Sequence, residues 1–519
     1  MKKTGDTIRF NGREAVLGEA LGGGGEGTVF KIELPGKVNG EVKMVPAAVK
    51  IIDTKKKTDQ EVERIRRQII ELIDVRKASK EKATTPHSGS LNEFLIMPQF
   101  LLDGDLGYVM KLVTGFESLT KYISIPKEES MQEEWQRKYD LHRRYRVIAH
   151  LFERLEKIHI DGLVFSDLSP NNIMVSMKSD DSIRIIDTDN MRTKANPFAN
   201  VLGTPGFIAP ELYKITEQTH ALTEEEKGNV DSVYLLSEES DVYSAAVIAF
   251  ELLTLNHPFK GVKAVGDDTT PEDELDAEKG KFDYILKPGT GNYCEGNIFV
   301  DKFNEITTPE IRDLFMRTFV DGRDNPLRRP SANEFKREFQ RARGLIFKCP
   351  YCGEESIYST SFDGRGKLRS TAVCINPDCE KPISGQLLLS IYAIPNDQSV
   401  DYVILGENEI NPGKKPVVLT QIVLREKEEH WLYLPDIGIS GDLKADDRFG
   451  RMVVSGEKAI IDIVKPLDGS TIEIVSKEKK PSVPVTKYAE FPYEHDFILF
   501  QNIRTSHGTI KIVGAIQRV

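Results

Sequence analysis

Four polar blocks, which occur in one order between apolar segments, constrain the fold of this chain more than any other feature. The first is a glycine-rich stretch at residues 21–29, and the second is Lys50 in an apolar, strand-like run. The third holds Asp167 and Asn172 in a loop with a proline, and the fourth is Asp187 at the end of an apolar run. An isolated aspartate or asparagine in a turn is usually only a turn former. Four such blocks with workable gaps instead indicate one polar site.

The glycine-rich stretch lies between predicted strands and contains G-x-G-x-x-G followed by a valine. Its candidate ligand-binding residues are Gly22, Gly23, Gly24, Gly25, Gly27 and Val29. Because glycine has no Cβ, backbone N–H groups in such a stretch can approach phosphate oxygens closely. The stretch lacks the Lys-Ser/Thr pair of a P-loop and does not open a helix, so neither a P-loop nor a Rossmann unit is indicated. A flexible turn is the alternative for the glycine run taken alone.

Lys50 lies on a predicted strand, from which its ammonium group can reach nucleotide phosphates. A surface position on an edge strand is the alternative. In the first case the ammonium group needs a carboxylate to hold it in place. The apolar spacing over residues 59–78 predicts a helix, and this helix offers Glu61, Glu63 and Glu71. We expect Glu71 to be the partner, because it lies beside the apolar stripe of the helix.

The third and fourth blocks have the residue types that phosphoryl transfer requires, namely a carboxylate near the attacking hydroxyl and oxygen ligands for Mg²⁺. Asp167 and Asn172 lie between a predicted helix and a predicted strand, so both side chains can point into one cleft. Asn172 offers a metal ligand that adds no charge. Asp187 offers a second carboxylate, which can bridge Mg²⁺ to the β- and γ-phosphates. The two blocks therefore predict an Mg²⁺–nucleotide site.

Residues 8–343 resemble a eukaryotic-type serine/threonine protein kinase domain. The family's HRDxxxxN loop has its counterpart in Phe-Ser-Asp-Leu-Ser-Pro-Asn-Asn at residues 165–172, and its DFG motif in Asp-Thr-Asp at residues 187–189. Residues 203–211 resemble the end of the activation segment with its APE motif, and residues 240–244 resemble the start of the buried central helix. Small-molecule kinases share an Asp…Asn loop but generally lack the last two features, so the protein kinase interpretation is favoured.

The resemblance implies a bilobal α+β domain that binds ATP with Mg²⁺ (or Mn²⁺) and phosphorylates protein substrates. Lys50 would hold the α- and β-phosphates, and Asp167 would orient or deprotonate the substrate hydroxyl. Asn172 and Asp187 would bind the metal. These four residues are the catalytic set that the resemblance implies.

Further residues are assigned by the same resemblance. Residues 108–113 resemble the strand and hinge that receive adenine, with Met110 as the gatekeeper. Backbone groups around Lys111 and Val113 would bind the base, and Ala48 would line the pocket.

Three residues have structural roles by this resemblance. Arg329 corresponds to a late arginine of the family that pairs with the glutamate of the APE motif, which implies an ion pair between Glu211 and Arg329. Asp241 lies at the start of the expected central helix.

The chain also departs from the family pattern. Ser166 replaces the HRD arginine, so a phosphorylated activation segment has no arginine there to dock on. Ser169 replaces the loop lysine that steadies the γ-phosphate, and Thr188 and Asp189 replace the phenylalanine and glycine of DFG. The minimum set for Mg²⁺–ATP chemistry is nevertheless present. An active kinase is therefore favoured over a nucleotide-binding pseudokinase scaffold that recruits partners.

Within the family, the motif forms at residues 167–172 and 187–189 resemble a divergent, tellurite-resistance-associated bacterial branch. Members of this branch often accompany von Willebrand A-type proteins and a metal-dependent serine/threonine phosphatase. The similarity implies a role in bacterial signalling or stress response, with these two kinds of protein as partners.

Four of the five cysteines form the pattern C-x2-C…C-x4-C: Cys349, Cys352, Cys374 and Cys379. Two thiolates on one tight turn can occupy two corners of a tetrahedron, and a second such turn can occupy the others. Residues 344–385 thus resemble a zinc ribbon, with a hairpin through residues 363–366. Because all four ligands are thiolates, we expect a structural rather than a catalytic Zn²⁺ site.

Residues 386–519 contain short alternating apolar runs, which are typical of a β-sandwich. A forkhead-associated-like fold that binds phosphothreonine is one interpretation. The family's Gly-Arg…Ser-x-x-His pattern is missing, although Gly450-Arg451 and Ser506-His507-Gly508 occur. No binding residues are assigned in this region.

Length and charge limit the remaining alternatives. A chain of 519 residues exceeds one hydrophobic core, since cores stop growing near ~250–300 residues. We expect a kinase-like domain at residues 1–343 (N-lobe 1–113, C-lobe 114–343), the ribbon at 344–385 and the β-rich domain at 386–519. The net charge of -11 disfavours nucleic-acid binding. Neither a signal peptide nor a membrane span is apparent, so we expect a cytoplasmic protein.

Overall fold

The computed structural model contains two compact units. Unit 1 comprises Met1–Ile125, His150–Tyr293 and Thr318–Ala332, and unit 2 comprises Pro126–Ala149, Cys294–Arg317 and Asn333–Val519. The residues that the structure describes are 2–24, 27–38, 41–55, 57–82, 90–123, 140–178, 181–196, 198–199, 203–214, 234–362, 368–379, 381, 383, 387–395, 417–433, 448–463, 472–475, 483–485, 488–492, 496–505 and 508–518.

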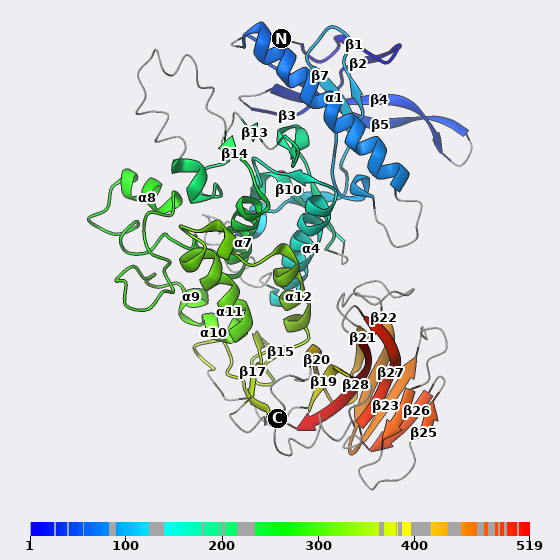
Figure 1. Ribbon diagram of the computed structural model, residues 1–519, viewed down its shortest axis with the longest axis vertical. Helices are drawn as coiled ribbons and strands as arrows, with labels where there is room; N and C mark the ends of the chain where they lie inside the picture. Colours follow the sequence, from blue (N-terminus) through cyan, green and yellow to red (C-terminus); the bar gives the residue numbers. More distant parts are fainter. Residues whose placement is uncertain are drawn as a thin grey trace. The chain divides into compact units, whose positions relative to one another are not determined.

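The N-terminal part of unit 1 is a five-stranded antiparallel sheet with the strand order β3-β4-β5-β7-β6 (Figure 1). Its strands are β3 (Ala20–Gly24), β4 (Gly27–Val38), β5 (Glu41–Ile52), β6 (Phe100–Leu101) and β7 (Gly107–Lys111). Strands β4 and β5 pair along their whole length, from Gly27 opposite Ile52 to Val38 opposite Glu41.

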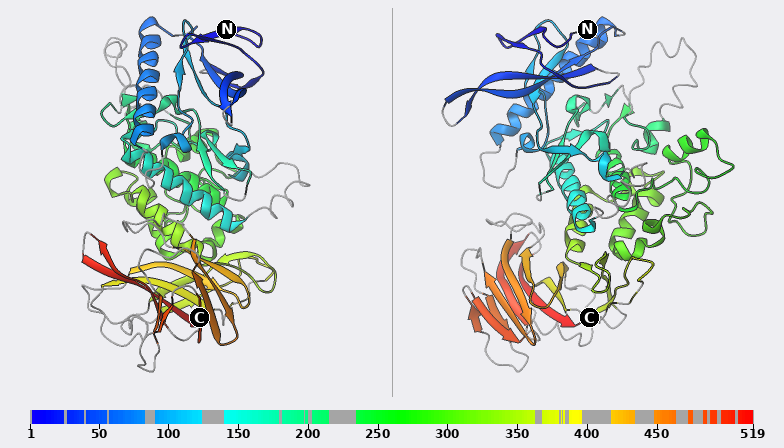
Figure 2. Two further views of the ribbon diagram at one scale, coloured as in Figure 1. Left: turned by 90° about the vertical axis from the view of Figure 1, so that its right-hand side faces the viewer. Right: turned by 180° about the vertical axis from the view of Figure 1, so that it is seen from behind.

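Both faces of this sheet are covered, because successive side chains of a strand point to opposite faces. Val49 of β5 packs in one cluster with Phe10 of the β1–β2 hairpin, and its neighbour Ala48 packs in another with Ile69 of helix α1. Figure 2 shows α1 running along the sheet. The covering elements are β1 (Thr7–Phe10), β2 (Arg13–Val16) and α1 (Asp59–Lys82). The lysine that follows Val49 therefore points toward the helix side of the sheet.

The rest of unit 1 surrounds helix α7 (Glu238–Thr254), whose side chains are nearly all buried. Its Tyr243 and Phe250 rings meet Phe319 edge-on, with ring centroids 5.8 and 6.1 Å apart. A helix that is apolar on all sides is stable only in such an interior. The expected central helix is thus present.

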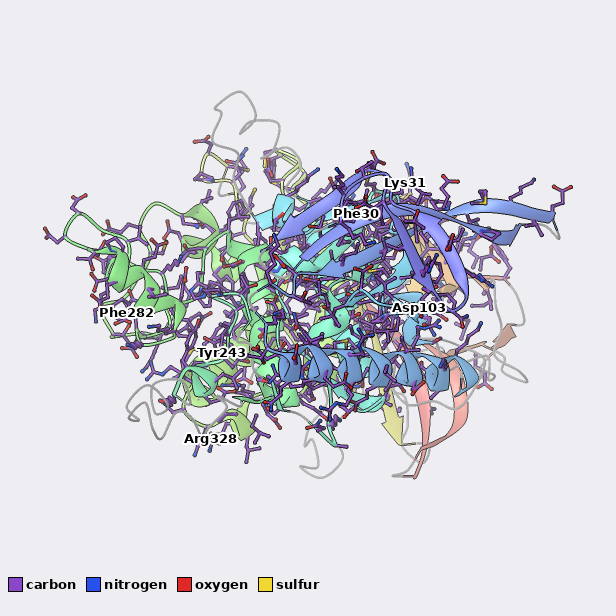
Figure 3. All side chains as sticks on the ribbon, turned by 90° about the horizontal axis from the view of Figure 1, so that it is seen from above. Phe30, Lys31, Asp103, Tyr243, Phe282 and Arg328 are labelled. Atoms are coloured by element: carbon purple, nitrogen blue, oxygen red, sulfur yellow. The ribbon has the colours of Figure 1, made fainter. Side chains whose placement is uncertain are left out.

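Short elements complete unit 1. One sheet consists of three short strands: β8 (Phe116–Ser118), β10 (Ile173–Ser176) and β11 (Ile183–Ile185). Two further pairs of strands are β9 (Leu163–Val164) with β12 (Arg192–Thr193) and β13 (Phe198–Ala199) with β14 (Tyr234–Leu235). Two short helices are α2 (Thr120–Ile123) and α8 (Pro271–Glu278). Figure 3 shows Phe30, Lys31 and Asp103 of the sheet region on one side of unit 1 and Tyr243, Phe282 and Arg328 of the helical region on the other. Unit 1 therefore contains both a strand-rich and a helical lobe.

The described part of unit 2 includes several helices. They are the first part of α4 (Leu141–Ile160), then α9 (Ile298–Asp301), α10 (Phe303–Ile306), α11 (Pro309–Met316) and α12 (Ala332–Arg343). The Tyr145 ring packs on Phe339 of α12 at 5.0 Å between ring centroids, and its hydroxyl donates to the backbone carbonyl of Ile306 at 2.6 Å. Phe315 packs on Phe335 at 5.9 Å.

These helices contact residues beyond position 343, where we expected a domain boundary. The backbone N–H of His142 donates to Glu355 at 3.1 Å, and the Arg341 guanidinium of α12 donates to Gln421 at 3.3 Å. Unit 2 consequently groups part of the expected C-lobe with the cysteine-rich segment and the β-rich region.

The described strands of the β-rich region form two sheets. The six-stranded sheet has the order β20-β19-β28-β27-β24-β25, and the four-stranded sheet has the order β21-β22-β23-β26. The strands are β19 (Leu387–Pro395), β20 (Val417–Leu424), β21 (Glu429–Tyr433), β22 (Arg448–Ser455), β23 (Lys458–Ile463), β24 (Ile472–Val475), β25 (Val483–Val485), β26 (Tyr488–Pro492), β27 (Asp496–Thr505) and β28 (Gly508–Arg518). Leu389 and Ile512 of the first sheet share one buried cluster with Met452 and Ile461 of the second. Two sheets with a common core form a β-sandwich.

Some predictions fall outside the described residues, namely those on Gly25, on the ribbon hairpin at residues 363–366, and on Ser506 and His507. Among the described helices, none is both long enough and apolar enough to cross a membrane.

Candidate active site

Lys50 is positioned by the centre of the five-stranded sheet. It lies on β5 opposite Val29 of β4 and Tyr108 of β7, so strands flank it on both sides. Lys50 is only 4% exposed, which excludes the alternative of an edge or surface lysine. A buried ammonium group must be paired, because the unpaired charge would be costly to desolvate. The contacts of Lys50 therefore identify its neighbours in the candidate site.

Among the residues that the structure describes, the carboxylates of Asp187 and Asp189 contact the Lys50 ammonium. Asp187 Oδ1 lies 2.6 Å from Lys50 Nζ, and Asp189 Oδ2 and Oδ1 lie 3.0 and 3.1 Å from it. Burial alone would lower the pKa of Lys50, but the charges of Asp189 and Asp187 more than offset this and raise the pKa above its ordinary value. Lys50 is therefore fully charged at neutral pH.

Asp187 follows strand β11 and has a left-handed backbone conformation, with φ 57° and ψ 42°. This conformation is uncommon and costly for a residue other than glycine, and it persists only where surrounding contacts enforce it. Burial raises the pKa of Asp187 above its ordinary value; Lys50 opposes this shift, while the charges of Asp189 and Asp167 add to it. Asp187 and Asp167 are thus close enough to interact electrostatically.

Asp167 is held by Asn172 and by Thr204. Asn172 Nδ2 donates to Asp167 Oδ2 at 3.0 Å and to the Asp167 carbonyl at 2.9 Å. The backbone N–H and the hydroxyl of Thr204 both donate to Asp167 Oδ1, at 2.8 and 2.7 Å. A backbone bond from Ile186 N–H to the Asn172 carbonyl, at 2.9 Å, ties this loop to the residue that precedes Asp187. The structure therefore brings Asp167, Asn172 and Asp187 together.

Thr204 is a site residue that the sequence reasoning did not assign. It lies within the Gly-Thr-Pro segment that marked the end of the activation segment. A hydroxyl residue directly after a glycine in that segment was the available signal. Its contact with Asp167 depends on how residues 203–211 fold back on the loop of Asp167, which the spacing alone does not specify.

The glycine-rich stretch forms strand β3 and the start of β4. Gly22 pairs with Val29, and Gly24 pairs with Gly27. A Cβ at Gly27 would lie 2.3 Å from the Ile51 carbonyl oxygen, so only glycine fits between β4 and β5. A Cβ at Gly22 would meet nothing within 4 Å, which leaves open space beside that residue.

The residues expected to meet adenine lie in one apolar cluster on the helix side of the sheet. Ala48 and Met110 are buried in it, and Val29 and Val113 pack against it. Lys111 is exposed at the end of β7. The structure thus brings four residues that were predicted to bind ATP together on the sheet face that also presents Lys50: Val29, Ala48, Met110 and Val113.

Glu71 does not join this site, and the prediction that it pairs with Lys50 is wrong. Its side chain is exposed, and Glu71 Oε1 accepts a hydrogen bond from the Thr193 hydroxyl at 2.9 Å. Helix α1 instead directs Gln68 toward the site, where the side-chain amide donates to the Asp189 carbonyl. The apolar stripe indicated which side of the helix is buried, but not how the helix is rotated relative to Lys50.

Buried polar contacts support the loop that carries Asp167. Both oxygens of Asp241 on α7 accept from the Phe165 backbone N–H at 3.1 Å, and His159 Nε2 lies 2.9 Å from Asp241 Oδ2. Burial raises the pKa of Asp241 above its ordinary value, although the hydrogen bond from His159 opposes the shift.

The ion pair that the resemblance implies is also present. Arg329 donates from both terminal nitrogens to the two oxygens of Glu211, each at 2.7 Å. Its guanidinium carbon lies 5.0 Å from the centre of the Tyr243 ring. Bidentate geometry and burial make such a pair specific in orientation.

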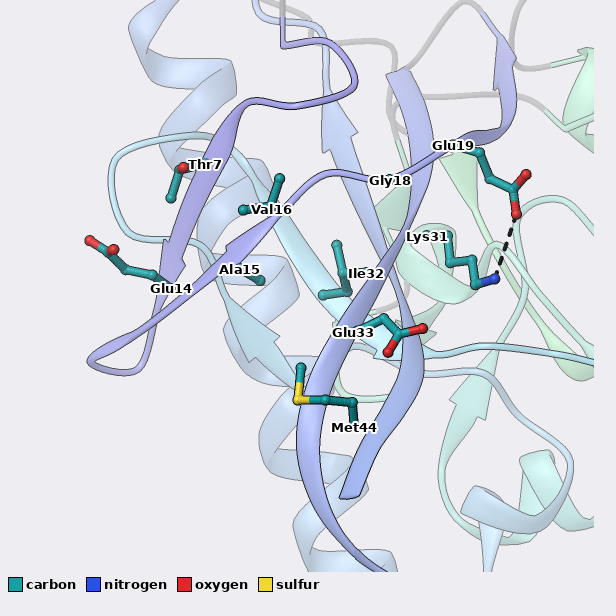
Figure 4. A pocket seen from close by; sticks show the side chains of 10 residues that line it. All are labelled: Thr7, Glu14, Ala15, Val16, Gly18, Glu19, Lys31, Ile32, Glu33 and Met44. Atoms are coloured by element: carbon teal, nitrogen blue, oxygen red, sulfur yellow. Dashed lines mark ion pairs between the residues drawn. The ribbon is translucent and has the colours of Figure 1, made fainter. Parts of the chain in front are cut away.

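A separate pocket lies beside the β1–β2 hairpin. Figure 4 shows its lining residues, among them Glu19 and Lys31, whose charged groups are 3.7 Å apart. None of the described residues predicted to bind nucleotide lines this pocket. It is therefore not part of the candidate active site.

The cysteine cluster is in unit 2. The sulfur atoms of Cys349, Cys352, Cys374 and Cys379 all lie within 4.8 Å of one another. A tetrahedral zinc ion with Zn–S bonds of about 2.3 Å needs sulfur atoms about 3.8 Å apart. The Cys349–Cys379 distance is 3.8 Å and the Cys352–Cys374 distance is 3.3 Å. The cluster therefore has the size and the ligand types of a zinc site.

A short hairpin forms the first cysteine turn. Strand β15 (Ile346–Lys348) pairs with β16 (Glu355–Ile357), and Gly353 between them has a φ of 85°. Burial would raise the pKa of the Cys349 thiol, but hydrogen bonds from the Tyr351 and Cys352 backbone N–H groups hold this pKa at about 7, below its ordinary value. The second hairpin pairs β17 (Ser359–Phe362) with β18 (Leu368–Thr371).

Comparison with known families agrees with this arrangement. The profile of the family described as Protein kinase domain matches residues 16–336, which is more than half of the chain. The chain therefore belongs to the protein kinase family. Members of this family transfer a phosphoryl group from ATP with the help of Mg²⁺.

Several protein kinases are similar to parts of the chain. Calcium-dependent protein kinase 5 of Plasmodium berghei is 29% identical over 244 residues, which are 46% of this chain and 34% of that protein. The meiosis-specific serine/threonine-protein kinase mek1 of Schizosaccharomyces pombe is 25% identical over 173 residues, 33% of this chain and 32% of that protein. Serine/threonine-protein kinase PknL of Mycobacterium tuberculosis is 30% identical over 123 residues, 23% of this chain and 26% of that protein. The chain spans about a third or less of the length of these relatives.

Proposed function

We propose that this chain is an ATP- and Mg²⁺-dependent protein kinase that phosphorylates serine or threonine hydroxyls of protein substrates. The observation that carries the proposal is the convergence in unit 1 of Lys50 with Asp187 and of Asp167 with Asn172. The similar serine/threonine kinases support this choice of acceptor.

The charges of the site suit a bound triphosphate. Lys50 offers one positive charge to the phosphates, and the open space beside Gly22 leaves room for them. The carboxylate of Asp187, with 38% of its side chain exposed, and the side-chain oxygen of Asn172 would hold Mg²⁺. Bound Mg²⁺ would neutralise charge that develops on the β- and γ-phosphate oxygens.

Asp167 would accept the proton of the substrate hydroxyl. Thr204 donates two hydrogen bonds to one of its oxygens and Asn172 donates one to the other, so the carboxylate plane is set before substrate binds. Such preorganisation reduces the cost of orienting the base during the reaction.

The departures from the family pattern define how this kinase differs. At the position of the loop lysine, Ser169 is fully buried and its hydroxyl has no hydrogen-bond partner among the described residues. Ser169 therefore does not supply the positive charge that the loop lysine of the family places near the γ-phosphate. Ser166, at the position of the HRD arginine, donates to the Asn190 carbonyl at 2.8 Å, so a neutral hydrogen bond links the two loops without phosphorylation.

A nucleotide-binding scaffold without transfer activity is the alternative, and the variant Asp167→Asn separates the two. Loss of a positioned general base lowers rates by about 10²–10⁴-fold. We expect the variant to lose labelling from γ-labelled ATP and to keep the thermal stabilisation by Mg²⁺–ATP, because Asp167 does not hold the nucleotide. Asp74→Asn, an exposed substitution of the same kind on α1, is the matched control. Equal labelling of wild type and Asp167→Asn would exclude the kinase proposal.

We further propose that the four cysteines bind one structural Zn²⁺. The size of the sulfur cluster supports this proposal. A phosphothreonine-binding role for the β-sandwich, bacterial signalling, and partners of the phosphatase and von Willebrand A types stay predictions.

A further inference from the structure

The lysine of a protein kinase is normally held by a glutamate of the helix that packs on the sheet. In this chain the three candidate glutamates of α1 have other partners. Glu61 accepts from the Thr58 backbone N–H at 2.6 Å, Glu63 lies 3.9 Å from Arg67, and Glu71 accepts from Thr193 at 2.9 Å. The anion that holds Lys50 therefore comes from another element.

The α1 side chain that reaches the site is neutral. The Gln68 amide donates to the backbone carbonyl of Asp189. An amide can hydrogen-bond, but it cannot balance the charge of a buried ammonium group. Helix α1 is thus attached to the loop of Asp189, and it does not provide the anion.

The side chain of Asp189 provides that anion. Both of its oxygens contact Lys50 Nζ, at 3.0 and 3.1 Å, and the Tyr108 hydroxyl donates to Oδ1 at 2.9 Å. Only 8% of the Asp189 side chain is exposed. Because Tyr108 lies opposite Lys50 in the β5–β7 pairing, the sheet itself orients both partners of the carboxylate.

We propose that Asp189 is the positioning residue for Lys50 and replaces the helix glutamate of the family. The inference rests on the proposed nucleotide site. It explains two departures from the family together. One is the carboxylate of Asp189 at the position of the DFG glycine, and the other is the neutral Gln68, which faces the Asp189 loop from helix α1.

Asp187 and Asp189 divide two tasks between them. Asp187 is the more exposed of the two, with 38% of its side chain accessible against 8% for Asp189. Once Asp187 is engaged by a divalent cation, its charge is shared with that cation and holds Lys50 less strongly. Asp189, bound to Tyr108 and away from solvent, then keeps the ammonium group in place.

This arrangement changes how the kinase could be controlled. In the family, the ion pair between helix and lysine makes activity depend on the position of the helix. Here the anion lies two residues after the metal-binding aspartate, and the helix contributes a neutral hydrogen bond through Gln68. Displacement of α1 would therefore disturb Lys50 less than in a kinase with a helix glutamate.

The test measures nucleotide binding by calorimetry, with Mg²⁺ and a non-hydrolysable ATP analogue as one probe and adenosine as the other. Asp189→Asn keeps the shape of the side chain and an acceptor for Tyr108. We expect it to raise the Kd of the analogue about 10- to 100-fold, the size of effect of one charge-assisted hydrogen bond. The Kd of adenosine should stay unchanged, because adenosine has no phosphate for Lys50 to bind.

Two further variants sharpen the test. Glu71→Gln should leave the Kd of the analogue unchanged, and so should the control Asp74→Asn.

Three outcomes would overturn the inference. The first is that Asp189→Asn binds the analogue with wild-type affinity. The second is that Asp189→Asn loses analogue and adenosine binding equally, which would mark a structural role only. The third is that Glu71→Gln loses as much affinity for the analogue as Asp189→Asn does. Failure of the proposed function looks different, because wild type would then bind the analogue but transfer no phosphate.

Discussion

At the scale of single residues, the site depends on close backbone approaches as much as on charged groups. A Cβ at Gly203 would lie 2.4 Å from the Ser166 carbonyl oxygen and 3.0 Å from Asp167 Cα. The next residue, Thr204, donates both of its hydrogen bonds to Asp167. Glycine is thus needed at position 203 although its φ is not unusual, because the backbone there passes so close to Ser166 and Asp167.

We expect Gly203→Ala to separate the activation segment from the catalytic loop. The added methyl group forces a backbone shift, which costs about 1–3 kcal/mol of unfolding free energy. It also weakens the bonds that orient Asp167, so labelling from γ-labelled ATP should fall at least about tenfold. Urea unfolding and a labelling assay measure the two effects. Thr204→Ser, which retains the hydroxyl, should behave as wild type, and an unaffected Gly203→Ala would show that this close approach is not required.

At the scale of elements, a histidine joins the end of α7 to the activation segment. Leu255 ends α7 in a left-handed conformation with φ 58°. Two residues later, His257 Nε2 lies 2.9 Å from the Gly206 carbonyl, and His257 Nδ1 accepts from the Phe259 backbone N–H at 3.4 Å. Burial lowers the pKa of His257 to about 4, although the hydrogen bond to Gly206 opposes the shift. The folded protein therefore holds this side chain neutral.

Because the folded protein holds His257 neutral, we expect the protein to lose stability in acid. The pKa of His257 is about 4 in the folded state and near 6.5 in the unfolded chain. As the pH falls, His257 binds a proton in the unfolded chain before it does so in the folded protein. The contribution of neutral His257 to the free energy of unfolding is therefore complete above pH 6.5 and is lost as the pH falls toward 4. The loss should reach roughly 3 kcal/mol. His257→Gln keeps a donor for Gly206 and should remove this part of the pH dependence in urea unfolding.

His142 in unit 2 gives the matched comparison. Burial also lowers its pKa to about 4. His257→Gln should retain the acid-sensitive contribution of His142. If the unfolding free energy of His257→Gln declined as steeply with falling pH as that of wild type, His257 would not be a cause of the acid sensitivity.

At the scale of the whole molecule, the kinase family match and the compact units have different boundaries. The family profile covers residues 16–336, whereas unit 2 takes up Pro126–Ala149 and Cys294–Arg317 from within that range. The physical reason lies in packing: Tyr145 packs on α12, and α12 bonds to the β-rich region through Arg341. Unit 2 therefore joins helices of the kinase family match to the cysteine cluster.

Removal of the metal should consequently affect unit 2 more than nucleotide binding in unit 1. We expect purified protein to contain about one zinc per chain, and Cys349→Ser to lose it, because a structural site needs all four ligands. The variant should melt at a lower temperature and still be stabilised by Mg²⁺–ATP. Metal analysis and thermal unfolding measure this.

Cys294→Ser is the matched control, because Cys294 lies outside the cluster. It should keep the zinc content and the melting temperature of wild type. Full zinc content in Cys349→Ser would contradict the assignment.

Patterns within short segments predicted much of this molecule. The alternation of apolar and polar residues over residues 8–52 indicated strands, among them β5, and the spacing over residues 59–78 indicated a helix, which the structure places at Asp59–Lys82. These features follow from local periodicity, which the sequence displays directly. The partner of Lys50 was predicted wrongly, because the rotation of α1 about its axis depends on packing against the sheet and the loop of Asp189.

The order of the polar blocks, the pairs of cysteines and the residue types needed for phosphoryl transfer were all readable from the chain by itself, since each depends only on residue identity and spacing. Folding decided which carboxylate meets Lys50, that Thr204 holds Asp167, and that helices of the family match pack with the cysteine cluster. These contacts join residues far apart in the chain. Their distances depend on how whole elements pack, and no local pattern encodes that.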